Sequence, residues 1–176
     1  MTTWVALLRG INLGRNKRIA MADLRTLLES LGYDAVRTHL QSGNAIFTAG
    51  GTAGTLEREI ASGIEAELGL DVKVLARTAR QLGAVVERNP FLPQDVDPKA
   101  LGATFLSAAP SPKVVGDLDS NLVAPDAFAF GDRVVYTYSP RGVMASRLPN
   151  WEKLLGLSAT ARNWNTVTRL HTLASG

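Results

Sequence analysis

The sequence contains no cysteine. This absence excludes disulfide bonds, thiolate nucleophiles and cysteine-ligated metal ions, and it fits the reducing cytoplasm, which is the location we expect. No apolar run approaches the ~20 residues that a membrane-spanning helix needs, and the N-terminus lacks a signal-peptide pattern, so no membrane partner is expected. A content of 45% hydrophobic and 20% charged residues is typical of an ordinary globular protein.

Carboxylates are absent from residues 9–18, a segment that is rich in positive charge. Its cations are Arg9, Arg15, Lys17 and Arg18. Since the whole chain carries a net charge of only +3, the rest of the chain is slightly negative and the positive excess is local. The segment also contains Gly10 and Gly14, whose backbone N–H groups can converge with the cations on one point. It therefore predicts a loop that binds an anion.

Groups for acid–base chemistry are scarce in the polar segments of the chain. General acid–base catalysis at neutral pH needs His, Asp, Glu or Lys beside the reacting atom, and in these segments only Lys17 qualifies. The two histidines, His39 and His171, have no partner at the spacing of a metal site or a catalytic triad. We therefore expect no metal and no cofactor, and the sequence leaves open whether the protein is an enzyme.

The hydrophobic pattern predicts an α+β fold made of two ferredoxin-like (βαββαβ) units in tandem plus a C-terminal helix. Strand and helix patterns follow the order β-α-β-β-α-β within residues 1–77. A bridging helix and a proline-rich extended linker occupy residues 78–100. Residues 101–176 repeat the order more loosely and end in the terminal helix. Together these parts are expected to form one compact domain.

Several local expectations follow from the same pattern. Thr55 is predicted to cap the second helix, and residues 143–155 are predicted to form a helix interrupted near Pro149. Trp4 and Phe47 are expected in the core. The loop after the first strand and the hairpin around Gly43 are expected at opposite ends of the sheet, which argues against a single site shared by them.

Two further segments are dense in hydrogen-bonding groups and lack carboxylates. The turn Gln41-Ser42-Gly43-Asn44 separates two predicted strands, with Gly43 supplying a positive φ angle. Near the C-terminus, Asn163 or Asn165 is predicted to cap the last helix, with Arg162 just outside its N-terminus. An arginine beside a helix N-terminus combines a bidentate cation with free N–H donors, which is an arrangement that can hold an anion.

Five short motifs resemble those of one known family in the same order along nearly the full chain. They are Leu7-Leu8-Arg9-Gly10-Ile11-Asn12, Met21-Ala22-Asp23-Leu24-Arg25, Gln41-Ser42-Gly43-Asn44, Asn89-Pro90-Phe91 and Arg162-Asn163-Trp164-Asn165-Thr166-Val167. On these motifs the chain resembles the DUF1697 family of uncharacterised conserved proteins. The resemblance implies two ferredoxin-like units and implies no reaction. This chain has Arg15 where the family commonly has a second glycine, and Ala20 where it often has proline.

The sequence leads to three functional hypotheses. The first is an anion-binding protein that recognises a nucleotide or nucleic-acid phosphate through its basic loops. The others are an enzyme acting on a phosphorylated small molecule, and a protein-interaction module; the oligomeric state is left open. The expected ligand-binding residues are Arg9, Gly10, Asn12, Gly14, Arg15, Lys17, Gln41, Ser42, Asn44, Arg162, Asn163 and Thr166.

Overall fold

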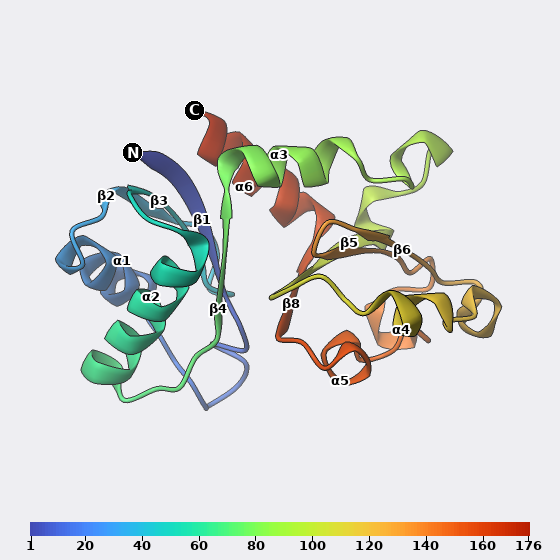
Figure 1. Cartoon of the computed structure of the whole chain (residues 1–176), viewed down its shortest axis with the longest axis horizontal. Coiled ribbons are helices and arrows are strands. Elements are labelled where there is room, and N and C mark those ends of the chain that lie inside the picture. The colour runs from blue at the N-terminus through green and yellow to red at the C-terminus, as the bar shows by residue number, and fades with distance from the viewer. The chain divides into compact units, whose positions relative to one another are not determined.

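The structure, a computed structural model, describes all residues from 1 to 176. It contains two four-stranded antiparallel sheets, and each sheet carries the element order β-α-β-β-α-β (Figure 1). This confirms the predicted α+β fold of two ferredoxin-like units followed by a C-terminal helix. No helix has the length and apolar character needed to cross a membrane.

The first unit is built on a sheet with the strand order β2-β3-β1-β4. Its elements are β1 (Thr2–Leu8), α1 (Met21–Ser30), β2 (Asp34–Thr38), β3 (Asn44–Ala49), α2 (Ala53–Leu68) and β4 (Val74–Thr78). Helices α1 and α2 lie on the same face of the sheet (Figure 1). The central strand β1 pairs antiparallel with both β3 and β4, as its continuous apolar sequence predicts.

The core of the first unit forms where the apolar stripes of the two helices meet one face of the sheet. Leu24 and Leu28 of α1 and Ile60 of α2 are completely buried in it. Trp4 and Phe47, the two aromatic residues expected in the core, are also buried there. Helix α2 begins earlier than predicted, because the Thr52 hydroxyl, and not that of Thr55, accepts the capping hydrogen bond (3.3 Å from Thr55 N).

The second unit repeats the same strand order, β6-β7-β5-β8. Its strands are β5 (Leu101–Leu106), β6 (Ala127–Gly131), β7 (Val134–Tyr138) and β8 (Ala159–Asn163). Its crossover helices are α4 (Pro112–Gly116) and α5 (Trp151–Leu155). The remaining elements are α3 (Ala79–Glu87), α6 (Trp164–Ser175) and the 3₁₀ turns η1 (Leu92–Gln94), η2 (Pro98–Ala100), η3 (Ser120–Val123) and η4 (Val143–Ala145).

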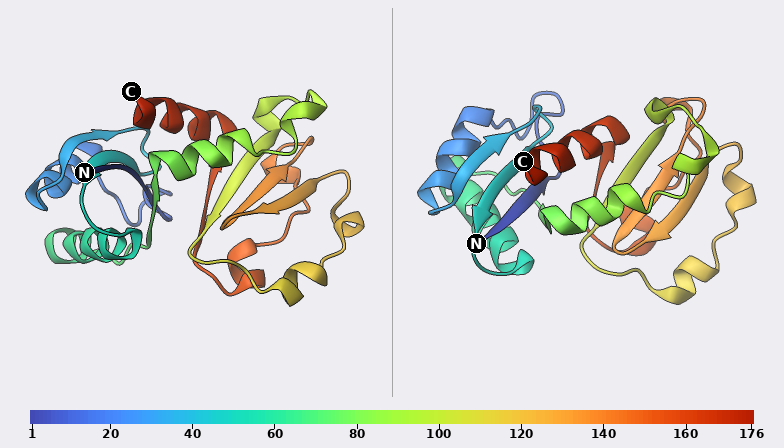
Figure 2. Two further views of the ribbon diagram at one scale, coloured as in Figure 1. Left: turned by 45° about the horizontal axis from the view of Figure 1, so that its top comes forward. Right: turned by 90° about the horizontal axis from the view of Figure 1, so that it is seen from above.

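The crossover helices of the second unit are much shorter than those of the first. Helices α4 and α5 have five residues each, whereas α1 and α2 have 10 and 16. Both short helices lie on one side of the second sheet (Figure 2). The predicted helix over residues 143–155 is therefore only partly right, since η4 and α5 are separated by an extended stretch that contains Pro149, which cannot continue a helix. The linker predicted as extended contains η1 and η2.

The chain divides into two compact units. The first comprises Met1–Gly83 together with Arg169–Gly176, and the second comprises Ala84–Thr168. The boundaries thus fall within α3 and α6, and the C-terminal residues group with the first unit, whereas the sequence placed the whole terminal helix with the second half.

Candidate anion-binding site

The basic loop, residues 9–18, is folded back on itself by residues in the left-handed region of backbone space. Gly10 and Gly14 have φ angles of 67° and 79°, and Asn12 and Lys17 have φ angles of 55° and 50°. The backbone N–H of Asn12 donates to the carbonyl oxygen of Lys17 (3.0 Å). The glycines therefore serve a loop that reverses direction between β1 and α1.

The side chain of Asn12 holds this loop closed. Its Oδ1 accepts a hydrogen bond from Ile19 N (2.9 Å), and its Nδ2 donates to Ile19 O (2.9 Å) and to Gln41 O (2.6 Å). One acceptor and two donors are thus used within the protein. Asn12, predicted as a ligand-binding residue, is placed to position the loop.

The basic loop and the hairpin lie at the same end of the first sheet, so the expectation that they lie at opposite ends is wrong. Because β1 and β3 are antiparallel, the end of β1 lies beside the start of β3, with Leu7 opposite Asn44. Leu8 N donates to Gly43 O (2.9 Å). A Cβ atom at Gly43, whose φ is +87°, would approach Ile11 Cδ1 to 2.6 Å, so only glycine fits this close contact.

The other hairpin residues divide into a buried and an exposed group. Asn44 is fully buried, and its Nδ2 donates to His39 O (2.7 Å) and Ser42 Oγ (3.0 Å), so its side chain closes the turn. The side chains of Gln41 and Ser42 are at the surface. Of the predicted hairpin residues, these two are therefore the ones that solvent reaches beside the basic loop.

The cations of the basic loop are all exposed, and a neighbouring segment adds another one. Arg9 N donates to Lys73 O (2.9 Å), and Lys17 Nζ donates to Asp71 O (2.7 Å), so residues 71–73 border the loop. Lys73 is exposed and was not among the predicted residues. The strand order could have indicated Lys73, because this residue directly precedes β4, and β4 pairs with the end of β1, where the basic loop starts. Asp71 is the carboxylate of this border.

Helix α1 begins directly after the basic loop. Its N-cap residue is Ala20, which has no side chain that can satisfy the first N–H groups of the helix. The partial positive charge of the helix N-terminus adds to that of the loop cations, and Asp23 in the first turn offsets part of it.

The C-terminal segment that was predicted as a binding site belongs to the second unit. The exposed fraction of Arg162 is 8%, and its Nη1 donates to Thr160 Oγ1 (2.7 Å) and to Ala161 O (2.9 Å). Burial lowers the pKa of Arg162 to about 10, so the guanidinium stays protonated at neutral pH. Asn163 Oδ1 accepts from Thr166 N (2.9 Å), which confirms the predicted helix cap.

Arg77 of β4 is the counterpart of Arg162 in the first unit. Arg77 lies opposite Val5 of the first strand, and Arg162 lies opposite Ala103 of β5. Arg77 is 3% exposed, and its Nη1 donates to the carbonyl oxygen of the preceding residue (2.9 Å), as in Arg162. Arg77 was not among the predicted residues, although Ala-Arg before a capping residue at 76–78 and at 161–163 is a visible repeat.

The structure thus brings together the basic loop, the hairpin and Lys73 within one unit. It places the predicted residues Arg162, Asn163 and Thr166 in the other unit. That these three act together with the basic loop stays a prediction.

Comparisons with known proteins agree with this fold. A conserved bacterial protein, SP0830 from Streptococcus pneumoniae, has a similar solved structure, with a TM-score of 0.79 at 20% sequence identity. The similarity covers 100% of this chain and 99% of that chain, and at this identity it concerns the fold alone. None of the curated proteins compared with the chain matches it. The profile of the family described as "Protein of unknown function (DUF1697)" matches residues 1–136, so the chain belongs to the DUF1697 family.

Proposed function

We propose that the protein binds a polyanion, the phosphate backbone of a nucleic acid, through a surface that we call the basic end. The basic end consists of the exposed side chains of Arg9, Arg15, Lys17, Arg18 and Lys73. The observation that carries the proposal is that the segments bearing these five cations border one another at one end of the first sheet, where hydrogen bonds fix them to each other. Nucleic acids are abundant in the cytoplasm, where we propose that the protein meets them.

The exposure of these cations favours a polyanion over a single small phosphate. A site for one small phosphate uses donors that converge on a confined point, whereas a nucleic acid presents phosphates along an extended backbone. All five side chains of the basic end are exposed, so they can contact several phosphates at once. Arg15 makes no hydrogen bond or ion pair within the protein, and its guanidinium is therefore available to a ligand.

The rigid backbone of the basic end supports the same proposal. Asn12 ties the loop to Ile19 and to the hairpin, so little backbone entropy is lost when a ligand binds. Lys17, the acid–base candidate of the enzyme hypothesis, is exposed and hydrogen-bonded to a carbonyl oxygen. A carbonyl oxygen cannot take up or return a proton for Lys17, and we therefore favour binding over catalysis at this surface.

The proposal is tested by fluorescence anisotropy with a labelled single-stranded oligonucleotide. We expect the wild-type protein to bind it and Arg15→Ala to weaken binding several-fold, in line with the loss of one charge contact. Arg58→Ala, which removes an exposed arginine of α2, is the matched control and should leave the affinity unchanged. Equal affinities of the wild type and Arg15→Ala would contradict the proposal. Binding of small phosphates in place of oligonucleotides would favour the enzyme hypothesis.

A further inference from the structure

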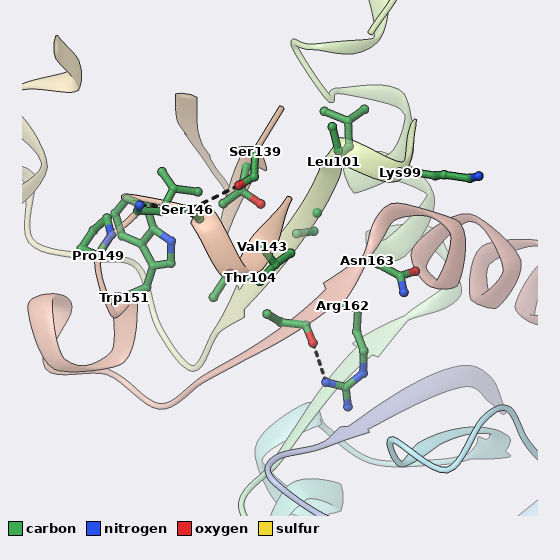
Figure 3. Close-up of a pocket in the computed structure, with 16 residues that line it drawn as sticks. Lys99, Leu101, Thr104, Ser139, Val143, Ser146, Pro149, Trp151, Arg162 and Asn163 are labelled. Atoms are coloured by element: carbon green, nitrogen blue, oxygen red, sulfur yellow. Dashed lines mark hydrogen bonds between the residues drawn. The ribbon is translucent and has the colours of Figure 1, made fainter. Parts of the chain in front are cut away.

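A cavity of about 410 Å³ opens on one face of the second sheet, and all the residues that line it belong to the second unit. Strands β5, β7 and β8 form its floor, and residues 143–151 form its opposite wall (Figure 3). The cavity exists because the sheet face carries little bulk at this place. Gly102 has no side chain, and this leaves room for the neighbouring Thr137 side chain, since a Cβ atom at Gly102 would come within 2.9 Å of Thr137 Oγ1. The nearby Ala161 is exposed on the same face.

The far wall of the cavity is mostly apolar. Leu148 and Trp151 line it and pack into the small core that also holds Leu106 and Val135. Val143 lies at the rim and is 82% exposed. We call the space between the small residues of the floor and this apolar wall the slot, and mostly apolar sites of this kind hold the flat rings of ligands.

One side of the slot presents a hydrogen-bond acceptor that is fixed by a buried carboxylate. Asp126 is 4% exposed, and its Oδ2 accepts from Arg147 N (2.5 Å) and from Ser146 Oγ (3.3 Å). A carboxylate only accepts, so the Ser146 proton points to Asp126, and Ser146 in turn accepts from Ser139 (3.3 Å) and Leu148 N (3.2 Å). The oxygen of Ser139, a residue of the cavity wall, is left to accept from a ligand.

The carboxylate of Asp126, which ends this series of hydrogen bonds, accepts hydrogen bonds on only one of its two oxygens. Asp126 Oδ1 is buried and has no hydrogen-bond partner. The carboxylate therefore polarises the two serine hydroxyls more strongly than a fully satisfied one would. A ligand N–H or O–H group at Ser139 is favoured by this polarisation, whereas an anion is repelled.

Donors are available at the floor and at the edge of the cavity. Thr104 is 7% exposed, lies on the same sheet face as Gly102, and its hydroxyl has no hydrogen-bond partner in the protein. Asn163 lines the cavity and uses Oδ1 for the helix cap, so its Nδ2 group is free to donate. A ligand that has both donors and acceptors around a ring would satisfy these groups.

No cation is directed into the cavity. Arg162 lines it through its backbone, because its side chain lies on the opposite sheet face, with Thr160. Figure 3 shows that the guanidinium of Arg162 and the ammonium of Lys99 point away from Trp151 and Val143. We infer that the cavity binds an uncharged nucleoside or its base: a flat ring in the slot, with an N–H group on Ser139 and acceptors on Thr104 and Asn163.

Saturation-transfer NMR with the full-length protein tests this assignment on adenosine, guanosine, cytidine and uridine, with glucose and galactose as sugar probes. At least one nucleoside is expected to bind. Ala161→Leu fills the slot from an exposed position and should abolish binding, whereas Ala109→Leu, which adds the same atoms on an exposed loop outside the cavity, should retain it. Ser139→Ala should weaken binding about tenfold through the loss of one hydrogen bond.

Three outcomes would overturn the assignment: no nucleoside binding by the folded wild-type protein, undiminished binding by Ala161→Leu, or binding of the sugars alone. Thermal unfolding of each variant provides the control for correct folding. The cavity and the basic end involve different residues, so the assignment does not depend on the proposed function. Ala161→Leu is expected to leave oligonucleotide binding unchanged.

Discussion

Arg77 and Arg162 are buried arginines whose guanidinium groups bond to their own strands. Each Nη1 donates to the carbonyl oxygen of the preceding residue, and Arg162 also donates to a buried threonine hydroxyl. A charged group removed from water needs such partners, because desolvation disfavours its charged form. The lowered pKa of Arg162 has this cause. Within its own unit, Arg162 is thus first a structural residue.

The structural role of Arg162 leads to a prediction about stability. We expect Arg162→Ala to lower the free energy of unfolding by about 2 kcal/mol, since it leaves the Thr160 hydroxyl without its partner and creates a void. Arg80→Ala, at an exposed position of α3, is expected to change it by less than about 0.5 kcal/mol. Urea unfolding followed by circular dichroism measures both variants. If Arg162→Ala were as stable as the wild-type protein, the buried arginine would contribute nothing to stability.

The environment of Tyr33 leads us to expect that the protein loses stability at alkaline pH. Its hydroxyl donates to Glu59 Oε2 (2.6 Å), and burial, together with this carboxylate, raises the pKa of Tyr33 above its usual value of 10.0. Above that value the unfolded chain releases the proton while the folded protein keeps it, so stability falls as the pH rises. Tyr33→Phe should be less stable by about 1 kcal/mol at neutral pH and should show a flatter decline above pH 10. Urea unfolding over this pH range gives both curves, and parallel curves would contradict the expectation.

The contact between the basic loop and the hairpin depends on Gly43. Gly43→Ala combines a strained φ of +87° with a clash against Ile11, whereas Gly32→Ala has the same strain (φ +84°) and open space around it. We expect Gly32→Ala to cost about 1 kcal/mol and Gly43→Ala about 1–3 kcal/mol more. Gly43→Ala alone should also weaken oligonucleotide binding, because it displaces the loop. Equal effects of the two substitutions on stability and binding would show that the contact is unimportant.

The helix α6 depends on its cap. Asn163→Ala removes the acceptor of the Thr166 N–H group and is expected to destabilise the protein by about 1 kcal/mol. Asn163→Asp keeps an acceptor at this position and should retain most of the stability. Thermal unfolding compares the two variants with the wild type, and equal melting temperatures of all three would contradict a capping role.

The elements that the sequence predicted well are those with strong local signals. The order of strands and helices follows from the period of the apolar residues, and the cap at Asn163 and the positive φ at Gly43 follow from residue type. The meeting of the basic loop with the hairpin follows from the ferredoxin-like strand order, in which β1 pairs antiparallel with β3, and the expectation of opposite ends did not apply this pairing. Lys73 and the cavity were missed because segments far apart in the sequence create both.

The two units of the molecule share one strand order and one buried arginine position but differ in their polar surfaces. The first unit carries exposed cations on loops that are tied together, and the second carries a cavity between its sheet and residues 143–151. A duplicated fold that differs in this way can bind two different chemical groups. We propose phosphates for the first unit and an uncharged ring for the second.

The salt dependence of oligonucleotide binding is the sharpest test of phosphate contacts at the basic end. If the five cations of the basic end contact phosphates, the logarithm of the association constant falls linearly with the logarithm of the salt concentration. The slope should lie between about −2 and −4, because each contact on a single strand contributes about −0.7. Arg15→Ala should reduce the magnitude of the slope by about 0.7, and Arg58→Ala should not change it. A slope near zero, or a slope that Arg15→Ala leaves unchanged, would contradict phosphate binding at the basic end.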